Sequence, residues 1–235
     1  RWDAAMNLAV SGLLVKNFTS VGYEVVKTPR HVHEKLNATL VAGFDQQRTE
    51  HKVDQISGEV AGFVDLGRLA NEIMADLKPM HEEWSSTKLK ASNAYGLRIY
   101  RPGNTLTMHT DKLETHVISA IVHVDRDAEP WPIVIEGYDG RSVEVDLQPG
   151  EMLFYESAKC IHGRPRPLEG KWYTSLFVHY RPIDWSLRME DARALAEKWW
   201  GSEGFHVPDD GAFDRLQLTG TGYYEPDCEH RWCDL

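Results

Sequence analysis

The sequence predicts an α+β protein in which helices come early in the chain and a β-sandwich or barrel follows. Two observations carry this prediction. Before Trp84, apolar residues recur at helical spacing, whereas after it short apolar runs alternate with turns that contain Gly or Pro. Many short strands broken by such turns are typical of sandwiches and barrels. We expect the helices to pack against the outside of this β core.

The expected elements follow the chain in order. A first helix is expected over 31–44 and a second over 64–84, where apolar residues from Leu66 to Trp84 fall on one helical face. Pro79 lies inside the second stretch and is expected to kink or end it. Strands are expected at 94–100, 105–111, 115–124, 131–136, 142–147, within 148–157 after its Pro-Gly turn, and at 171–180.

The chain has 235 residues, which suits one domain with a sizeable core. We expect a single domain over 1–235, with a helical part at 1–90, a β core at about 91–182, and a C-terminal helix and tail at 183–235. Its helix is expected over 187–200. The tail beyond it, with Cys228 and Cys233, has no assigned role.

Composition excludes some classes of function. The formal net charge of -10 argues against a nucleic-acid partner, because proteins that bind the phosphate backbone are usually basic. No apolar run reaches the length of a membrane span. Three cysteines do not make a disulfide framework. The glycosylation sequons at Asn17 and Asn37 admit a secretory lumen and leave a cytoplasmic location open.

A histidine and an acid stand two residues apart at three places in the chain, and such pairs are candidate metal ligands. The pair His109/Asp111 lies on an expected strand, where residues i and i+2 share a face, together with threonines. His81/Glu83 falls in a helix, where such residues point about 200° apart. His123/Asp125 follows an apolar strand, so His123 is expected to be a packed histidine. We therefore favour His109 and Asp111.

His162 is the candidate for a third ligand, because it comes just after the expected strand that ends in "MLFYES". Two histidines and one carboxylate on one face of an ion form the facial triad of non-heme Fe(II) oxygenases. On spacing alone, His162 can equally be a loop histidine. Lys171 follows nine residues later. A lysine at the start of a strand usually points to solvent, but a dicarboxylate that chelates iron at one end needs a cation at the other.

In this order the residues resemble the prolyl 4-hydroxylase-like branch of the Fe(II)/2-oxoglutarate dioxygenases. The phrase "IYRPGNTLTMHTD" is similar to the first half of the motif of that branch, and "GEMLFYES" with "IHGRPRPLEGKW" is similar to the second half. The resemblance covers about residues 94–182. It implies a double-stranded β-helix (jelly-roll) core buttressed by helices.

The resemblance also implies a ligand set and cofactors. Iron would be held by His109, Asp111 and His162. Lys171 and Tyr100 would bind the distal carboxylate of 2-oxoglutarate, and Thr174 is a further candidate for the lining of that pocket. The cofactors would be Fe(II), 2-oxoglutarate as cosubstrate and O2, with ascorbate as an optional addition.

The implied reaction oxidises an unactivated C–H bond, most simply by hydroxylation, while 2-oxoglutarate is decarboxylated to succinate. The substrate would be proline-like, an amino acid or a peptide. Two departures weaken the inference to peptidyl proline: Leu106 stands where the branch often has tyrosine, and Phe177 where it often has tryptophan. Arg164 and Arg166 add positive charge near the motif, so we expect the substrate to carry a carboxylate.

Three alternatives remain. The same oxygenase chemistry could hydroxylate or cyclise a small carboxylate-bearing metabolite. A cupin-like metal enzyme without 2-oxoglutarate would not need Lys171. A β-sandwich binding module without chemistry would have no reason to present two histidines, an aspartate and a lysine in this order. Asp111 speaks against halogenation, because related halogenases have a small residue there.

Overall fold

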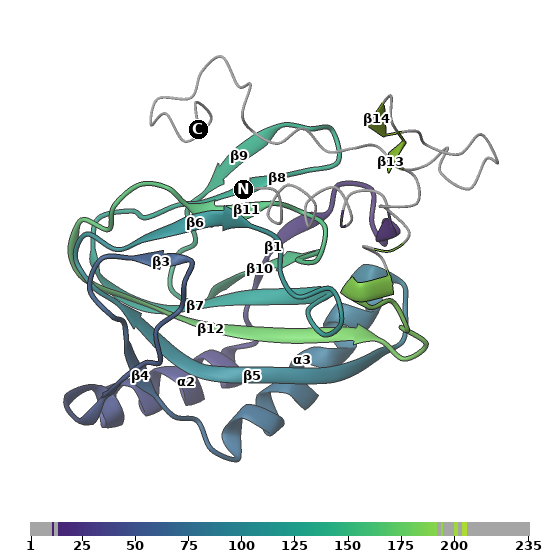
Figure 1. Cartoon of the computed structure of the whole chain (residues 1–235). Coiled ribbons are helices and arrows are strands. Elements are labelled where there is room, and N and C mark those ends of the chain that lie inside the picture. Colours follow the sequence, from purple (N-terminus) through teal and green to yellow (C-terminus); the bar gives the residue numbers. More distant parts are fainter. Residues whose placement is uncertain (1–10, 12–13, 192–193, 195–199, 202–203, 206–235) are drawn as a thin grey trace.

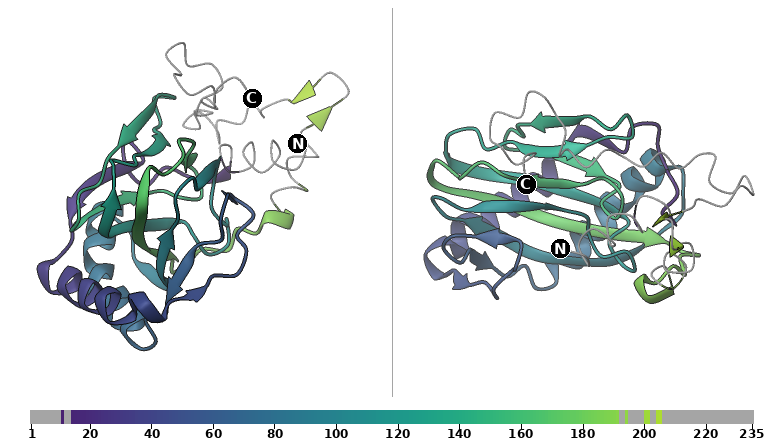
Figure 2. Two further views of the ribbon diagram at one scale, coloured as in Figure 1. Left: turned by 90° about the vertical axis from the view of Figure 1, so that its left-hand side faces the viewer. Right: turned by 45° about the horizontal axis from the view of Figure 1, so that its top comes forward.

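A computed structural model describes residues 11, 14–191, 194, 200–201 and 204–205. It shows two antiparallel β-sheets that face each other, with helices on the outer side of the larger sheet (Figures 1 and 2). This is the expected α+β arrangement with a jelly-roll core. No helix among the described residues is long and apolar enough to cross a membrane.

The major sheet has seven strands and forms the middle layer of the molecule (Figure 1). In spatial order these are β1 (Tyr23–Lys27), β10 (Glu151–Tyr155), β7 (Ile118–Ala128), β12 (Gly170–Pro182), β5 (Leu89–Tyr100), β4 (Gly62–Val64) and β2 (Arg48–Thr49). Of these, β5, β7, β10 and β12 correspond to strands expected from the sequence, although β7 begins at Ile118 rather than at residue 115.

The minor sheet has five strands and carries His109 and His162, whereas Asp111 lies two residues beyond the strand that ends at His109. In order these are β3 (Ile56–Ser57), β6 (Thr105–His109), β11 (His162–Arg164), β8 (Ile133–Glu136) and β9 (Ser142–Val145). The expected hairpin of the segments 131–136 and 142–147 is confirmed as β8 paired with β9. A separate short pair is formed by β13 (Trp200–Gly201) and β14 (Gly204–Phe205).

Two α-helices cover the outer face of the major sheet (Figure 1): α2 (Arg30–Gly43), which is followed by the 3-10 turn η1 (Phe44–Gln46), and α3 (Leu69–Ser85). Their buried residues, such as Leu36 and Leu77, share one core with the outward side chains of β5, β7, β10 and β12. The alternating face of β7 from Ile118 to Val124 belongs to this core, as its periodicity predicts.

The helix boundaries differ in part from expectation. The helix expected from residue 64 begins at Leu69, because β4 ends at Val64 and a turn follows in which Gly67 has φ +51°. Pro79 lies inside α3 without ending it. In the described part of the expected helix over 187–200, helical structure begins at Met189 rather than residue 187.

A second core lies between the two sheets. It joins Ile121, Leu153 and Tyr155 of the major sheet to Ile133 and Ile135 of the minor sheet. At one end of the sandwich, the rings of Tyr100, Trp131 and Tyr173 cluster with Leu168. The space between the sheets is therefore filled at that end, and this filling decides which side chains can reach the site.

Candidate active site

His109, Asp111 and His162 come together on the inner side of the minor sheet. Their ligand atoms all lie within 4.8 Å of one another. An Asp111 carboxylate oxygen is 3.6 Å from Nε2 of His109 and 3.9 Å from Nε2 of His162. The three side chains thus converge on one point, as a metal ion requires.

The strand pairing explains why the two histidines meet. His109 ends β6 and His162 begins β11, and their Cα atoms are direct partners across the antiparallel pair. A Cβ added to Gly163 would lie 2.7 Å from the Leu106 carbonyl oxygen and 2.9 Å from two backbone atoms of Met108. Only glycine allows β11 to approach β6 this closely, so Gly163 helps set the spacing of the two rings.

Hydrogen bonds select the tautomer of both histidines. Nδ1 of His109 donates to the Thr107 carbonyl oxygen at 2.7 Å, and Nδ1 of His162 donates to the Cys160 carbonyl oxygen at 2.9 Å. Each bond uses the Nδ1 proton of a neutral ring, so Nε2 keeps its lone pair and faces the cluster. Metal-binding histidines typically have such a partner on the other ring nitrogen, which orients the ring.

The electrostatics of the cluster also suit a cation. Burial alone would raise the pKa of Asp111, but His109, His162 and His179 lie around its carboxylate and hold that pKa well below its ordinary value. The pKa of His162 falls to about 4, first because of burial and then because of the nearby His109. At neutral pH, His162 is therefore a neutral ligand beside an ionised carboxylate. The hydroxyl of Tyr155 donates to the second Asp111 oxygen at 3.4 Å.

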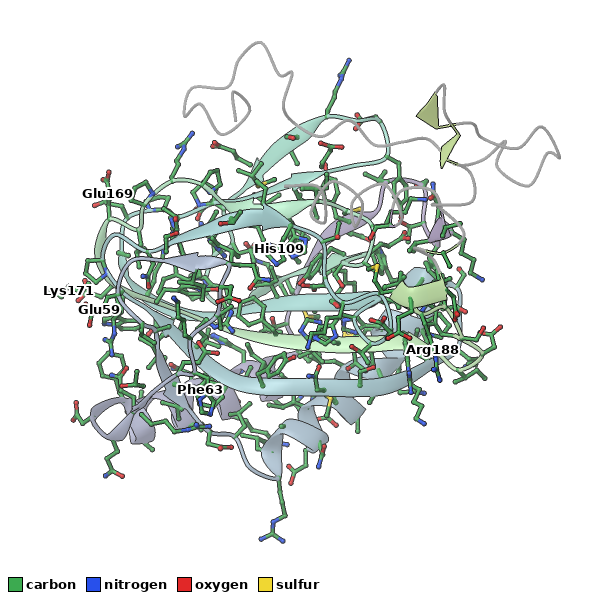
Figure 3. The ribbon with its side chains drawn as sticks, in the orientation of Figure 1. Glu59, Phe63, His109, Glu169, Lys171 and Arg188 are labelled. Carbon is green, nitrogen blue, oxygen red and sulfur yellow. The ribbon has the colours of Figure 1, made fainter. Side chains whose placement is uncertain are left out.

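A cavity of about 580 Å³ opens from this cluster. Figure 3 shows His109 near the middle of the molecule, between the sheets. The segment 50–55 forms one wall of the cavity, because it links β2 at the edge of the major sheet to β3 at the edge of the minor sheet. An apolar interior with convergent polar groups and an open mouth is the usual form of a small-molecule site.

Known structures with this architecture include a hydroxylase and an epimerase. A prolyl-4-hydroxylase from Pseudomonas putida has a TM-score of 0.55 and 15% identity, and the match covers 74% of this chain and 98% of that one. SnoN, an alpha-ketoglutarate-dependent epimerase from nogalamycin biosynthesis, has a TM-score of 0.56 and 14% identity, with coverage of 93% and 95%. The chain therefore shares the fold of these two enzymes.

A further protein of this fold is HygX from Streptomyces hygroscopicus, whose structure holds nickel and 2-oxoglutarate. It has a TM-score of 0.50 and 12% identity, with coverage of 71% of this chain and 85% of that one. No family model matches the sequence, and no curated protein matches it.

Lys171 is not part of the cavity in this structure. Its side chain is 78% exposed and its Nζ pairs with Asp127 at 2.8 Å; Figure 3 shows it at the left edge of the molecule. The pairing of β12 with β7 shifts register between Gly170 and Trp172, which places Lys171 at an irregular strand end. The aromatic cluster around Tyr173 fills the space between the sheets at this end. The expectation for Lys171 as the cosubstrate cation is therefore not supported.

Tyr100 and Thr174 have different surroundings. Tyr100 is fully buried in the aromatic cluster, but its hydroxyl accepts a hydrogen bond from Nη1 of Arg98 at 3.3 Å, and Arg98 lines the cavity. Thr174 pairs with Ile99, whose side chain belongs to the outer core, so Thr174 points away from the cavity. The expectation that Thr174 lines the pocket is wrong for this reason.

Arg164 and Arg166 do not face the cavity either. Arg164 is buried, with its guanidinium 4.5 Å from the ring centroids of both Trp131 and Tyr173, and it donates to the Trp131 carbonyl oxygen. Arg166 pairs with Glu144 at 2.5 Å near the surface. Both arginines have internal partners, so they give no support to a carboxylate on the substrate.

Leu106 and Phe177 both line the cavity, as expected of residues near the substrate. Sequence reasoning missed His179, which lies on the same face of β12 as Phe177 and approaches Asp111 at 3.8 Å. Its ring lies against that of His116, with centroids 3.8 Å apart and an angle of 37° between the ring planes. Alternation along the strand from Phe177 would have identified His179 as an inward residue.

The histidines of the two rejected pairs both pack inside the protein. His123 is buried, stacks on Tyr173 at 4.1 Å between ring centroids, and bonds through Nδ1 to the Thr174 carbonyl. His81 is buried in α3 between Phe154 and Tyr180. Within the part of the chain that the structure describes, His109, Asp111 and His162 are the group arranged to hold a metal.

Proposed function

We propose that this protein is an Fe(II)/2-oxoglutarate-dependent oxygenase that oxidises an unactivated C–H bond, with hydroxylation as its reaction. The observation that carries the proposal is the His109, Asp111 and His162 cluster, which faces a cavity inside a jelly roll with both Nε2 atoms ready to bind. Two imidazoles and a carboxylate are the ligand set of the facial triad, and they leave coordination positions open for other ligands.

The residues of the chain fit this role individually. His109 and His162 would bind iron through Nε2, with their rings held by the Thr107 and Cys160 carbonyls. Asp111 would supply the anionic ligand while Tyr155 holds its other oxygen. The bound iron, together with 2-oxoglutarate and O2, supplies the oxidising power, and succinate is a product. The apolar side chains in the cavity wall, such as Leu106, Ile121 and Phe177, would exclude water from the reacting groups.

The substrate proposal follows from the cavity. About 580 Å³ is the size of a small-molecule site, and it suits an amino-acid or proline-like group, free or as a side chain of a peptide. The wall also contains Lys52 and Lys112, both exposed, which would attract a carboxylate on the substrate. A small carboxylate-bearing metabolite that is hydroxylated or oxidatively cyclised is the second candidate.

Succinate release from 2-oxoglutarate tests the proposal. The Fe(II)-loaded protein is offered proline-rich peptides, acidic peptides and free amino-acid derivatives, and the His162→Ala variant serves as the control. We expect at least one substrate to stimulate succinate formation above the uncoupled rate in the wild type and none to do so in the variant. Equal succinate formation by both proteins would refute the assignment of the site.

A further inference from the structure

Because Lys171 lies outside the cavity, the distal carboxylate of a bound 2-oxo acid needs another cation. Among the described residues, the cations that line the cavity are Arg48, Lys52, Arg98 and Lys112. Lys52 and Lys112 are exposed, and the Arg48 side chain is 53% exposed beside Asp65. The Arg98 side chain is only 13% exposed. Arg98 is therefore the buried cation of this cavity wall.

The position of Arg98 follows from strand alternation in β5. Leu97 and Ile99 point into the outer core, so Arg98 and Tyr100 point inward, between the sheets. The Arg98 guanidinium lies 4.9 Å from the Phe177 ring centroid and donates to the Tyr100 hydroxyl. It lines the same cavity as the three metal-ligand candidates.

Arg98 already holds a carboxylate. Its Nε and Nη2 donate to the two oxygens of Glu50 at 2.6 and 2.8 Å, which is the bidentate geometry in which arginine binds a free carboxylate. Glu50 belongs to the wall segment 50–55, and its backbone N–H donates to the Ala61 carbonyl at 2.9 Å. The backbone N–H of Glu50 thus has its own partner, and the hydrogen bonds to Arg98 are made by the Glu50 side chain alone.

We propose that Arg98 is the anchor for the distal carboxylate of the 2-oxo acid, and that Glu50 is an internal competitor which occupies Arg98 until the acid displaces it. This inference rests on the proposed function. It transfers the role expected of Lys171 to Arg98, and Tyr100 stays beside the carboxylate because its hydroxyl contacts Arg98. The proposal concerns only the binding of 2-oxoglutarate, and no step of the oxidation depends on it.

Calorimetric titration of the Zn(II)-loaded protein with 2-oxoglutarate tests the proposal without turnover. Arg98→Gln should weaken binding by about 10- to 100-fold, the worth of hydrogen bonds to a charged group. Glu50→Gln should tighten binding by roughly five- to tenfold, because a neutral acceptor holds the guanidinium less strongly than a carboxylate does. Lys171→Met, the matched exposed cation, should leave the affinity unchanged.

A double variant and a second ligand make the result specific. In Arg98→Gln/Glu50→Gln the benefit of the Glu50 change should vanish, because the two residues act through one contact. 2-Oxopentanoate, which has a methyl group in place of the distal carboxylate, should bind all variants alike. Zn(II) affinity and the melting temperature, measured on the same samples, show whether each variant is folded.

The outcomes separate the two proposals. If the folded wild type binds Zn(II) but neither 2-oxo acid, the proposed function fails. If it binds 2-oxoglutarate and the Arg98 variant binds equally well, the inference about Arg98 is overturned, and a loss in Lys171→Met would return the role to Lys171. Weaker binding in Glu50→Gln would also overturn it, because Glu50 would then assist the acid rather than compete with it.

Discussion

The substitution Gly163→Ala tests how the fold sets the metal site. The added Cβ would stand 2.7 Å from the Leu106 carbonyl oxygen, and ordinary contact begins at 3.4 Å. Because the nearest atoms are backbone, β11 must move away from β6 by about 0.7 Å, the difference between these distances. Metal–ligand distances are normally held within about 0.2 Å. His162, which precedes Gly163, would therefore leave its place opposite His109.

We expect Gly163→Ala to lower the free energy of unfolding by about 1–3 kcal/mol, as overpacking does. We also expect its Co(II) or Zn(II) affinity to fall by about 10- to 100-fold, the cost of losing ligand orientation. Gly43→Ala is the matched control, because its Cβ would meet the Val64 side chain at 2.5 Å, in the outer core. The control should lose stability and keep its metal affinity. A Gly163→Ala protein with unchanged metal affinity would refute the reasoning.

Further predictions concern the histidines. His109→Ala, Asp111→Ala and His162→Ala should each abolish Zn(II) binding in calorimetry, whereas His123→Ala should retain it; metal loss in the His123 variant alone would mean that the wrong pair was chosen. Burial lowers the pKa of His81 to about 4, so the folded state binds this proton less readily than the unfolded state, whose pKa is about 6.5. Neutral His81 therefore contributes to the free energy of unfolding above pH 6.5. Roughly 3 kcal/mol of this contribution is lost as the pH falls toward 4. Denaturant unfolding of apo His81→Leu should show a smaller acid loss than the wild type, and equal losses would contradict this.

Local patterns in the sequence predict much of the fold. The alternation of Ile118, Ala120, Val122 and Val124 predicts one face of β7, and all four residues are in the outer core. The helical face through Ile73 and Leu77 likewise predicts α3. These patterns succeed because burial on one side of a strand or helix leaves a period in the sequence. Short strands such as β11, with three residues and a central glycine, leave no such period.

The residues of the site likewise divide into those that a local pattern predicts and those that it does not. The spacing of His109 and Asp111 in the sequence predicts the pair, although β6 ends at His109 and Asp111 lies just beyond it. His162 meets them through the pairing of β11 with β6, which no single segment of the sequence shows. Lys171 was misplaced because a register shift between paired strands is not visible in one strand. Glu50 was not predicted as a cavity residue, because the segment 50–55 lies beside the cavity only as the connection between β2 of one sheet and β3 of the other.

The central claim is that the triad binds iron together with 2-oxoglutarate, and an anaerobic titration tests it most directly. Fe(II) is added to the apo-protein first and 2-oxoglutarate second, while the visible spectrum is followed. We predict a weak charge-transfer band that grows with 2-oxoglutarate, does not form with succinate, and is absent from His162→Ala. A protein that binds Fe(II) but shows no band, or a band of equal strength in His162→Ala, would contradict the account.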